Sequence, residues 1–163
     1  PTIIVSIGAI NTSLAIIKDG ILVLTYLIPT GGNAITRSIE ADFGLTQSQS
    51  EEYKKTYGFS KTGAGKKVGK STEPILSSIL LEIKKALAFY SQKYKDEAII
   101  QQVLLSGGTA KLPGIDLFFA ENLGIETVVA NPWKIFANQQ IPPDLLNDTV
   151  DYTIALGLAM RDL

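Results

Sequence analysis

The chain has 163 residues and a net charge of −1, from 15 Lys and Arg against 16 Asp and Glu. This length fits one domain with room for a small insert, and the near-zero charge argues against a protein that binds nucleic acid by bulk electrostatics. The chain contains no Cys and no His, which excludes disulfides, Cys-ligated metals and the usual general base. Any chemistry must therefore use carboxylates, hydroxyls, lysines or backbone amides.

The first 30 residues predict three strands joined by short turns. The apolar run over 2–7 does not alternate with polar residues, which is typical of a strand buried on both faces. Asp19-Gly20 separates the runs 13–18 and 21–28 and predicts a type I′ hairpin turn. We therefore expect an antiparallel meander. Because the chain opens directly on a buried strand, we also expect it to be a part of a longer protein.

Two helices are predicted after the meander. Asn33 is a candidate N-cap for a helix over 33–43, which Gly44 ends as a C-terminal glycine. Thr46 and Gln49 have the spacing of a capping box, which predicts a second, more polar helix ending near Gly58.

The next segment is rich in glycine and lysine. Residues 60–71 predict a flexible, solvated loop. Its part 64–71 is close to the phosphate-binding pattern G-x-x-x-x-G-K-[ST], but Ala replaces the first Gly and no strand precedes it. We therefore do not interpret it as a phosphate site. Apolar residues at helical spacing then predict a long helix over 73–94, with Pro74 tolerated in the first turn.

The last third of the chain predicts alternating strands and helices. A meander followed by this β-α-β-α order is typical of a ribonuclease-H-like α/β fold. We expect a mixed five-stranded sheet with strand order 3-2-1-4-5, flanked by helices, and a small, mostly helical insert. The predicted elements are a strand over 101–105, a helix over 114–123, a strand over 125–129, an irregular stretch after Asn131 and a helix over 150–161.

Two glycine-containing turns at strand ends are candidate anion sites. In the first, Gly8 and Ala9 let backbone amides approach an anion, and Asn11 and Thr12 add side-chain donors. A plain hairpin turn would need the same glycine. In the second, Gly107-Gly108 follows a buried strand and precedes a helix, where open α/β sheets bind ligands. A tight strand-to-helix turn explains this pair equally well.

Glu51 and Lys54 stand three residues apart on the second predicted helix, so they share one face. From the residues alone, this pair is an exposed ion pair that contributes little to stability.

The two glycine turns, in this order, resemble the second phosphate loop and the adenosine loop of the actin/Hsp70/hexokinase nucleotide-binding superfamily. Within it, the chain is most similar to the PilM family, the actin-like proteins of type IV pilus assembly. The Ile-Pro-x-Gly-Gly and Asn-Pro-Trp stretches favour this family, and the likeness spans nearly the whole chain. The stretches that carry it are Ile7–Thr12, Ile28–Thr36, Ser50–Gly58, Gly107–Gly114, Asn131–Trp133 and Ala155–Ala159.

The resemblance implies an actin-like lobe. Such proteins have two lobes around a nucleotide cleft, and this chain resembles the second. Residues 1–44 and 96–163 would form subdomain 2A, and about 45–95 a 2B-like insert. The small residues within 155–159 would let the last helix pack closely against the first lobe.

The resemblance also implies a cofactor, ATP with Mg²⁺, held in the complete two-lobed protein. Ser6 stands where the superfamily usually has Asp, which implies at most a weak ATPase and an inactive isolated chain. The resemblance assigns no catalytic residue and no metal ligand to this chain. The implied phosphate-binding residues are Gly8, Ala9, Asn11 and Thr12, and the implied ribose- and adenine-binding residues are Glu51, Lys54, Gly107, Gly108 and Thr109.

The implied function is that of a cytoplasmic scaffold for pilus assembly, peripheral at the bacterial inner membrane. Its partners would be the first lobe and a PilN-like cytoplasmic tail that binds mainly to that lobe, with no nucleic acid and no direct membrane insertion. The alternative is an FtsA-like division protein or another filament-forming actin homologue. A sugar-kinase lobe is a further alternative, which would need a catalytic carboxylate from the first lobe.

Overall fold

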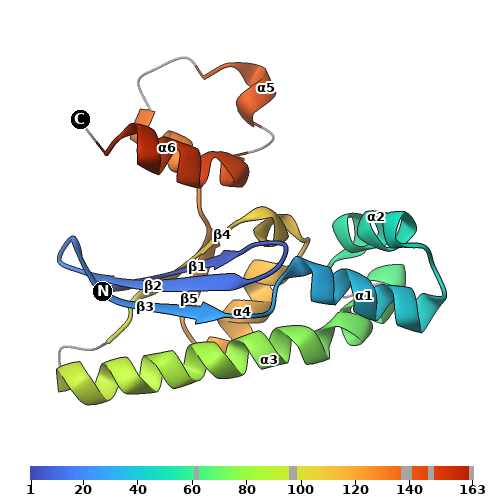
Figure 1. Ribbon diagram of the computed structural model, residues 1–163, viewed down its shortest axis with the longest axis horizontal. Helices are drawn as coiled ribbons and strands as arrows, with labels where there is room; N and C mark the ends of the chain where they lie inside the picture. The colour runs from blue at the N-terminus through green and yellow to red at the C-terminus, as the bar shows by residue number, and fades with distance from the viewer. Residues whose placement is uncertain (61–62, 96–98, 137–140, 147–148, 162–163) are drawn as a thin grey trace.

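A computed structural model describes residues 1–60, 63–95, 99–136, 141–146 and 149–161. Its centre is a five-stranded sheet with the order β3-β2-β1-β4-β5 (Figure 1). β1 is antiparallel to β2 and parallel to β4, which confirms the predicted mixed sheet and strand order. The strands are β1 (Thr2–Ile7), β2 (Thr12–Lys18), β3 (Ile21–Ile28), β4 (Gln102–Ser106) and β5 (Glu126–Val129).

The helices are distributed around this sheet. Figure 1 shows the long helix α3 running beneath the sheet, α1 and α2 beyond one end of it, and the C-terminal segment above it. The α-helices are α1 (Gly32–Phe43), α2 (Gln47–Tyr57), α3 (Gly63–Tyr94), α4 (Ile115–Leu123), α5 (Pro143–Leu146) and α6 (Thr153–Ala159), and the 3₁₀ helices are η2 (Gly108–Lys111), η3 (Pro132–Phe136) and η4 (Thr149–Tyr152).

The core lies on one face of the sheet. Ile3, Val5 and Ile7 of β1 are completely buried there, and α3 contributes buried residues such as Ile79 and Ile83 to the same cluster. The residues between them on β1 are only half-buried. The prediction of a strand buried on both faces is therefore wrong: β1 does alternate, with one face in the core and one half-exposed.

Several local predictions are confirmed. Asp19 and Gly20 have φ values of 50° and 76°, as a type I′ turn requires. The Thr46–Gln49 capping box begins α2, and Gly44 ends α1 in the left-handed conformation. These signals succeed because each depends on residues only a few positions apart.

The glycine- and lysine-rich segment was wrongly predicted to be a loop. Residues 63–71 are the first turns of α3, so the P-loop-like stretch is helical. Val68 and Thr72 are buried and continue the spacing that leads to Leu76. Gly65 is needed for close packing, since a Cβ there would lie 2.5 Å from the Cβ of Ser60. The burial of this face outweighs the cost of the glycines.

Pro74 lies in the interior of α3. The sequence predicts it in the first turn of the helix, and this prediction is wrong. Proline lacks the N–H that would bond to the Lys70 carbonyl four residues earlier. Both residues are exposed, so water can satisfy that carbonyl, and the helix continues.

The C-terminal segment is less regular than predicted. The expected helix over 150–161 is divided into η4 and α6, and parts of the expected irregular stretch, 137–140 and 147–148, lie outside the described residues. None of the helices among the described residues is long and apolar enough to cross a membrane.

Candidate functional site

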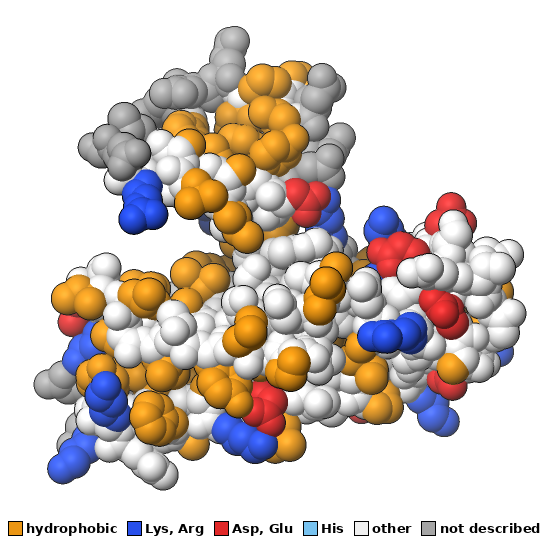
Figure 2. All heavy atoms as spheres, in the orientation of Figure 1, with side chains coloured by type: hydrophobic (Ala, Val, Ile, Leu, Met, Phe, Trp, Pro, Cys, Tyr) orange, Lys and Arg blue, Asp and Glu red, His pale blue; other side chains and the backbone are white. Residues whose placement is uncertain are grey.

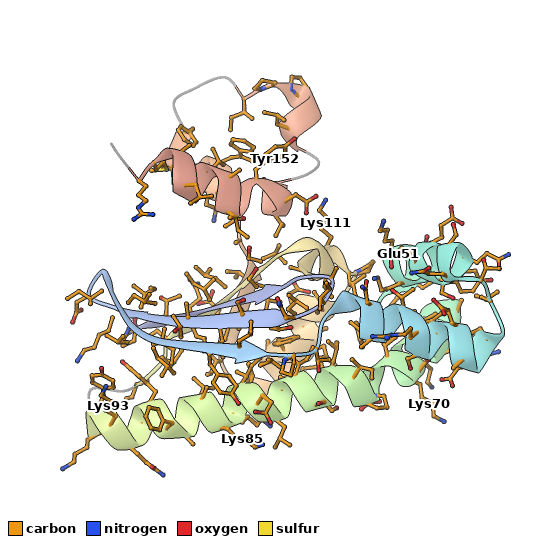
Figure 3. All side chains as sticks on the ribbon, viewed as in Figure 1. Glu51, Lys70, Lys85, Lys93, Lys111 and Tyr152 are labelled. Atoms are coloured by element: carbon orange, nitrogen blue, oxygen red, sulfur yellow. The ribbon has the colours of Figure 1, made fainter. Side chains whose placement is uncertain are left out.

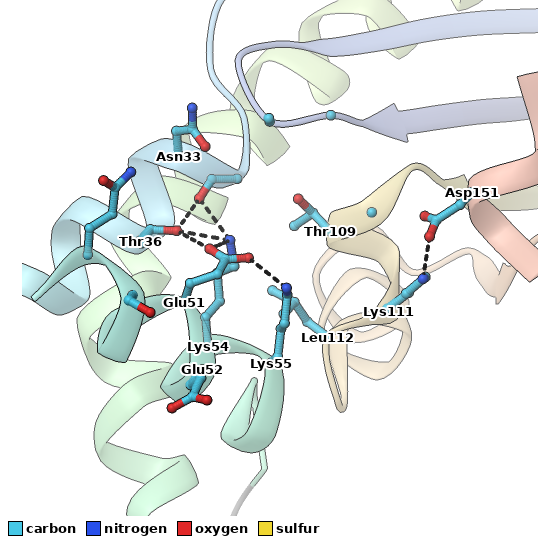
Figure 4. A pocket seen from close by; sticks show the side chains of 16 residues that line it. Asn33, Thr36, Glu51, Glu52, Lys54, Lys55, Thr109, Lys111, Leu112 and Asp151 are labelled. Carbon is cyan, nitrogen blue, oxygen red and sulfur yellow. Dashed lines mark hydrogen bonds and ion pairs between the residues drawn. The ribbon is translucent and has the colours of Figure 1, made fainter. Parts of the chain in front are cut away.

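A pocket of about 990 Å³ opens where β1, β4 and the helices α1 and α2 meet (Figure 4). Two glycine turns, the start of α1 and one face of α2 provide most of its lining. It combines polypeptide segments that are far apart in the sequence. The lining residues are Gly8, Ala9, Gly32, Asn33, Thr36, Gln47, Ser48, Glu51, Glu52, Lys54, Lys55, Gly108, Thr109, Lys111, Leu112 and Asp151.

The β1–β2 turn is held against the start of α1. The backbone amides of Gly32 and Asn33 donate to the carbonyls of Gly8 and Ala9, both at 2.8 Å. Gly31 permits this approach, because a Cβ there would lie 2.5 Å from the Gly8 carbonyl oxygen. The N-cap of α1 is therefore Gly31 without a side-chain cap, and the prediction of Asn33 as N-cap is wrong. Asn33 instead lines the pocket.

A network of charged and polar side chains forms the α2 wall of the pocket. The Lys54 Nζ lies 2.5 Å from Glu51 Oε2 and donates to Thr36 Oγ1 at 2.9 Å and to the Gly32 carbonyl at 3.3 Å. Thr36 Oγ1 donates to Glu51 Oε2 at 2.7 Å, and Lys55 Nζ lies 3.6 Å from Glu51 Oε1. Lys54 is 6% exposed, so the pair is not the exposed ion pair expected from helical spacing alone.

This network holds Glu51 in its charged form. Partial burial alone would raise the pKa of the Glu51 carboxyl, but the hydrogen bonds from Lys54 and Thr36 and the charges of Lys54 and Lys55 outweigh it. The pKa therefore lies below its ordinary value of 4.5. Glu51 presents an ionised acceptor to the pocket at neutral pH.

The two glycines after β4 have different surroundings. Gly107 has a φ of 82°, and a Cβ there would lie 2.6 Å from the Ile7 carbonyl oxygen, so this glycine lets the turn pass close to β1. A Cβ at Gly108 would meet only the Asp151 carboxylate, at 4.0 Å. Gly108 therefore leaves open space beside the pocket. Gly107 serves the fold, and it does not line the pocket.

An ion pair joins the pocket to the C-terminal segment. The Lys111 ammonium of η2 contacts the Asp151 carboxylate of η4, and both side chains line the pocket. In Figure 3, Lys111 points from the sheet towards the C-terminal segment that carries α6. This ion pair connects the pocket wall to η4, which directly precedes α6.

The structure brings six of the nine predicted site residues to this one pocket. Asn11, Thr12 and Gly107 do not line it. Thr12 is completely buried, and its hydroxyl donates to the Thr30 carbonyl at 2.8 Å. Its side chain holds the β1–β2 turn to the end of β3, and the phosphate-binding role expected for Thr12 stays a prediction.

Ser6 also lies away from this pocket. It lines a second, shallower hollow of about 370 Å³ over β1, β2 and β3. Its β1 position places it on the half-exposed face of the sheet.

Sequence reasoning missed eight polar residues of the pocket lining, and four of them take part in the ion pairs and hydrogen bonds described above. Lys55 lies one helical turn from Glu51 on α2, so helical spacing could have identified it. Thr36 lies on α1, where no site residue had been predicted. Lys111 and Asp151 are 40 residues apart, and no local pattern pairs them. They meet only because η2 and η4 pack against each other.

The sheet order, the flanking helices and a pocket between two glycine turns define an actin-like ATPase lobe fold. The family model of type IV pilus assembly protein PilM matches residues 2–163. The chain therefore belongs to the PilM family of actin-like pilus assembly proteins.

Solved structures agree with this fold. A PilM–PilN type IV pilus biogenesis complex is 24% identical, with a TM-score of 0.79 over 98% of this chain and 45% of that one. The ethanolamine utilization protein EutJ from Carboxydothermus hydrogenoformans is 26% identical, with a TM-score of 0.64 over 78% of this chain and 43% of that one. MreB5 of Spiroplasma citri bound to ADP is 20% identical, with a TM-score of 0.69 over 79% of this chain and 48% of that one. The chain thus spans about half the length of the solved structures it matches.

Proposed function

We propose that this chain is the nucleotide-binding second lobe of a scaffold for type IV pilus assembly. It binds ATP with Mg²⁺ in a cleft that it shares with a first lobe of the same protein. The insert of about 45–95 forms the 2B-like part, and the remaining residues form subdomain 2A. Nucleotide binding rather than turnover is its main role, because Ser6 replaces the usual Asp, lies outside the pocket of this lobe and offers no charge to hydrated Mg²⁺.

The observation that carries this proposal is the open space at Gly108. In this strand-to-helix turn Gly107 has a positive φ, and its close approach to Ile7 leaves no room for a Cβ. Gly107 therefore meets the turn's need for a glycine. The turn itself does not require the second glycine. Its missing side chain leaves room for a flat base or a sugar to lie on the backbone.

The other pocket residues suit a nucleotide. Ionised Glu51 offers an acceptor for ribose hydroxyls, and Lys54 is held rigidly beside it. Backbone groups at Gly8 and Ala9 face the same pocket from the opposite wall and would border the phosphates. A structural relative of this lobe, MreB5, is bound to ADP in its solved structure, which supports a nucleotide as the ligand.

α6 is the proposed contact with the first lobe. Ile154 and Leu158 are 67% and 63% exposed, and a Cβ at Gly157 would meet no atom within 4 Å. An apolar face with a small residue at its centre fits close packing against another element. The other proposed partner is a PilN-like tail, supported by the PilM–PilN complex. Such a tail would hold the protein at the cytoplasmic side of the inner membrane.

Titration of the full-length protein with ATP and Mg²⁺ tests the proposal. Gly108→Val places a branched side chain into the open space and should weaken ATP binding at least tenfold without unfolding the protein. Gly69→Ala is the matched control, since its Cβ would make only ordinary contacts, 3.7 Å from Phe59. ATP affinity that is unchanged in Gly108→Val would remove this turn from the nucleotide site.

A further inference from the structure

The two oxygens of the Asp151 carboxylate have different surroundings. Oδ2 contacts the Lys111 ammonium. Oδ1 faces Gly108 instead: among the described residues beyond the chain neighbours of Gly108, it is the nearest atom to the position of an added Cβ, at 4.0 Å. Both Asp151 and Lys111 line the pocket. A group that lies on the Gly108 backbone therefore meets a carboxylate oxygen at its edge.

The ion pair holds this carboxylate in a defined place relative to Gly108. Gly108 and Lys111 are the first and last residues of the single-turn helix η2, and η4, which carries Asp151, packs against η2. Figure 2 shows acidic and basic side chains together where the C-terminal segment meets the rest of the molecule. Because Lys111 and Gly108 belong to one short helix, the contact with Lys111 fixes the carboxylate beside the glycine.

The remaining walls of the pocket are suited to the other parts of a nucleotide. In the proposed function, Glu51 accepts from the ribose hydroxyls and the turn at Gly8 and Ala9 borders the phosphates. Figure 4 shows Asp151 across the pocket from Glu51. The base is therefore the part of the nucleotide that is left for the space at Gly108, within reach of Asp151.

We propose that Asp151 Oδ1 accepts a hydrogen bond from the exocyclic amino group of the base and so selects a 6-aminopurine. This inference rests on the proposed function. An ionised carboxylate accepts hydrogen bonds and donates none. Adenine carries an amino group at C6, whereas guanine and hypoxanthine carry a carbonyl oxygen there, which the carboxylate would repel. Asp151 thus determines base specificity, and Lys111 is a positioning residue that acts through it.

Titration of the full-length protein with ATP and with ITP, each with Mg²⁺, tests this role. ITP has the ribose and phosphates of ATP, but its base carries a carbonyl oxygen in place of the amino group. We expect the wild type to bind ATP about tenfold more tightly than ITP, as the loss of one hydrogen bond to a charged group implies. Asp151→Asn should remove most of this preference. A merely structural role would weaken both nucleotides by the same factor and leave their ratio unchanged.

Two further sets of variants control for charge and for position. Asp116→Asn makes the same chemical change at an exposed residue of α4 that does not line the pocket, so it should keep the wild-type ratio of ATP to ITP affinity. Lys111→Met should lower the ratio, because Asp151 loses the contact that positions it, and Lys111→Arg should preserve it. Circular dichroism establishes that all variants are folded.

The possible results separate this inference from the proposed function. A wild type that binds ITP as tightly as ATP, or an Asp151→Asn variant that keeps the wild-type ratio, would overturn the role of Asp151 and leave nucleotide binding by the protein intact. A wild type that binds neither nucleotide would overturn the proposed function and this inference with it.

Discussion

Replacing Lys54 by methionine removes the cation at the centre of the pocket wall. Lys54→Met keeps most of the apolar stem but loses the contacts to Glu51, Thr36 and the Gly32 carbonyl. Glu51 keeps the hydrogen bond from Thr36 and the more distant Lys55 at 3.6 Å. The substitution therefore leaves a partly buried carboxylate with weaker compensation.

The expected cost follows from the burial of the two partners. Removing one member of a fully buried ion pair costs about 3–5 kcal/mol. The Glu51 side chain is 37% exposed, so solvent screening reduces this value. We expect a loss of about 2 kcal/mol in the free energy of unfolding, which lowers Tm by roughly 4–8 °C in a domain of this size.

The pH dependence of the folding stability provides a second test of the contacts between Lys54 and Glu51. The pKa of Glu51 is lowered in the folded state relative to its ordinary value of 4.5, so this group stabilises the fold above pH 4.5. That contribution is lost as the pH falls below 4.5 and the folded carboxylate takes up a proton. In Lys54→Met the pKa returns towards its ordinary value, so the loss of stability between neutral and acid pH becomes smaller.

Urea unfolding at pH 7 and at several values below 4.5 measures both effects. Glu51→Gln in combination with Lys54→Met completes a double-mutant cycle and isolates the coupling between the two side chains. Wild-type stability in Lys54→Met at pH 7, together with an unchanged pH dependence, would show that the network does not stabilise the fold and would refute the reasoning.

The remaining predictions concern single positions. Gly107→Ala should lower Tm strongly, because its Cβ would lie 2.6 Å from the Ile7 carbonyl oxygen at a φ of 82°; an unchanged Tm would contradict the assigned contact. Gly108→Ala should leave Tm nearly unchanged, since its Cβ meets nothing closer than 4.0 Å. Pro74→Ala should raise the free energy of unfolding by about 1–2 kcal/mol by restoring an amide donor to the Lys70 carbonyl; chemical denaturation measures this gain, and a loss would mean that α3 needs the proline.

Most of the fold could be predicted because its signals are local. The Asp19-Gly20 turn, the Thr46–Gln49 capping box and Gly44 each act within a few residues. Once the strands and helices were ordered correctly, the connection rules of α/β proteins left few possible sheets. The spatial strand order β3-β2-β1-β4-β5 followed from the order of the elements along the chain.

The start of α3 could not be predicted because its cause is tertiary. Three glycines in 63–71 indicate a loop by their helix propensity. In the structure, Gly65 lies against Ser60 and Val68 enters the core, so the packing reverses the local preference. Nothing in the sequence shows that a particular glycine is needed for close approach rather than for flexibility.

The candidate site also has one part that local sequence signals predict and one part that depends on tertiary packing. The glycine turns identified Gly8 and Gly108, and the family resemblance added Glu51; all three line the pocket. The sequence did not show that Gly107 faces β1 while Gly108 faces the pocket. That distinction depends on how close the turn passes to Ile7.

One measurement tests the central proposal most directly: isothermal titration of ATP with Mg²⁺ into the full-length protein and into this 163-residue chain, side by side. The account predicts clear binding to the full-length protein and much weaker binding to this chain, since the lobe supplies one wall of the cleft. Absence of binding to the full-length protein would contradict it, and the glycine turns would then serve the fold alone. Equally tight binding to both would contradict the proposed shared cleft.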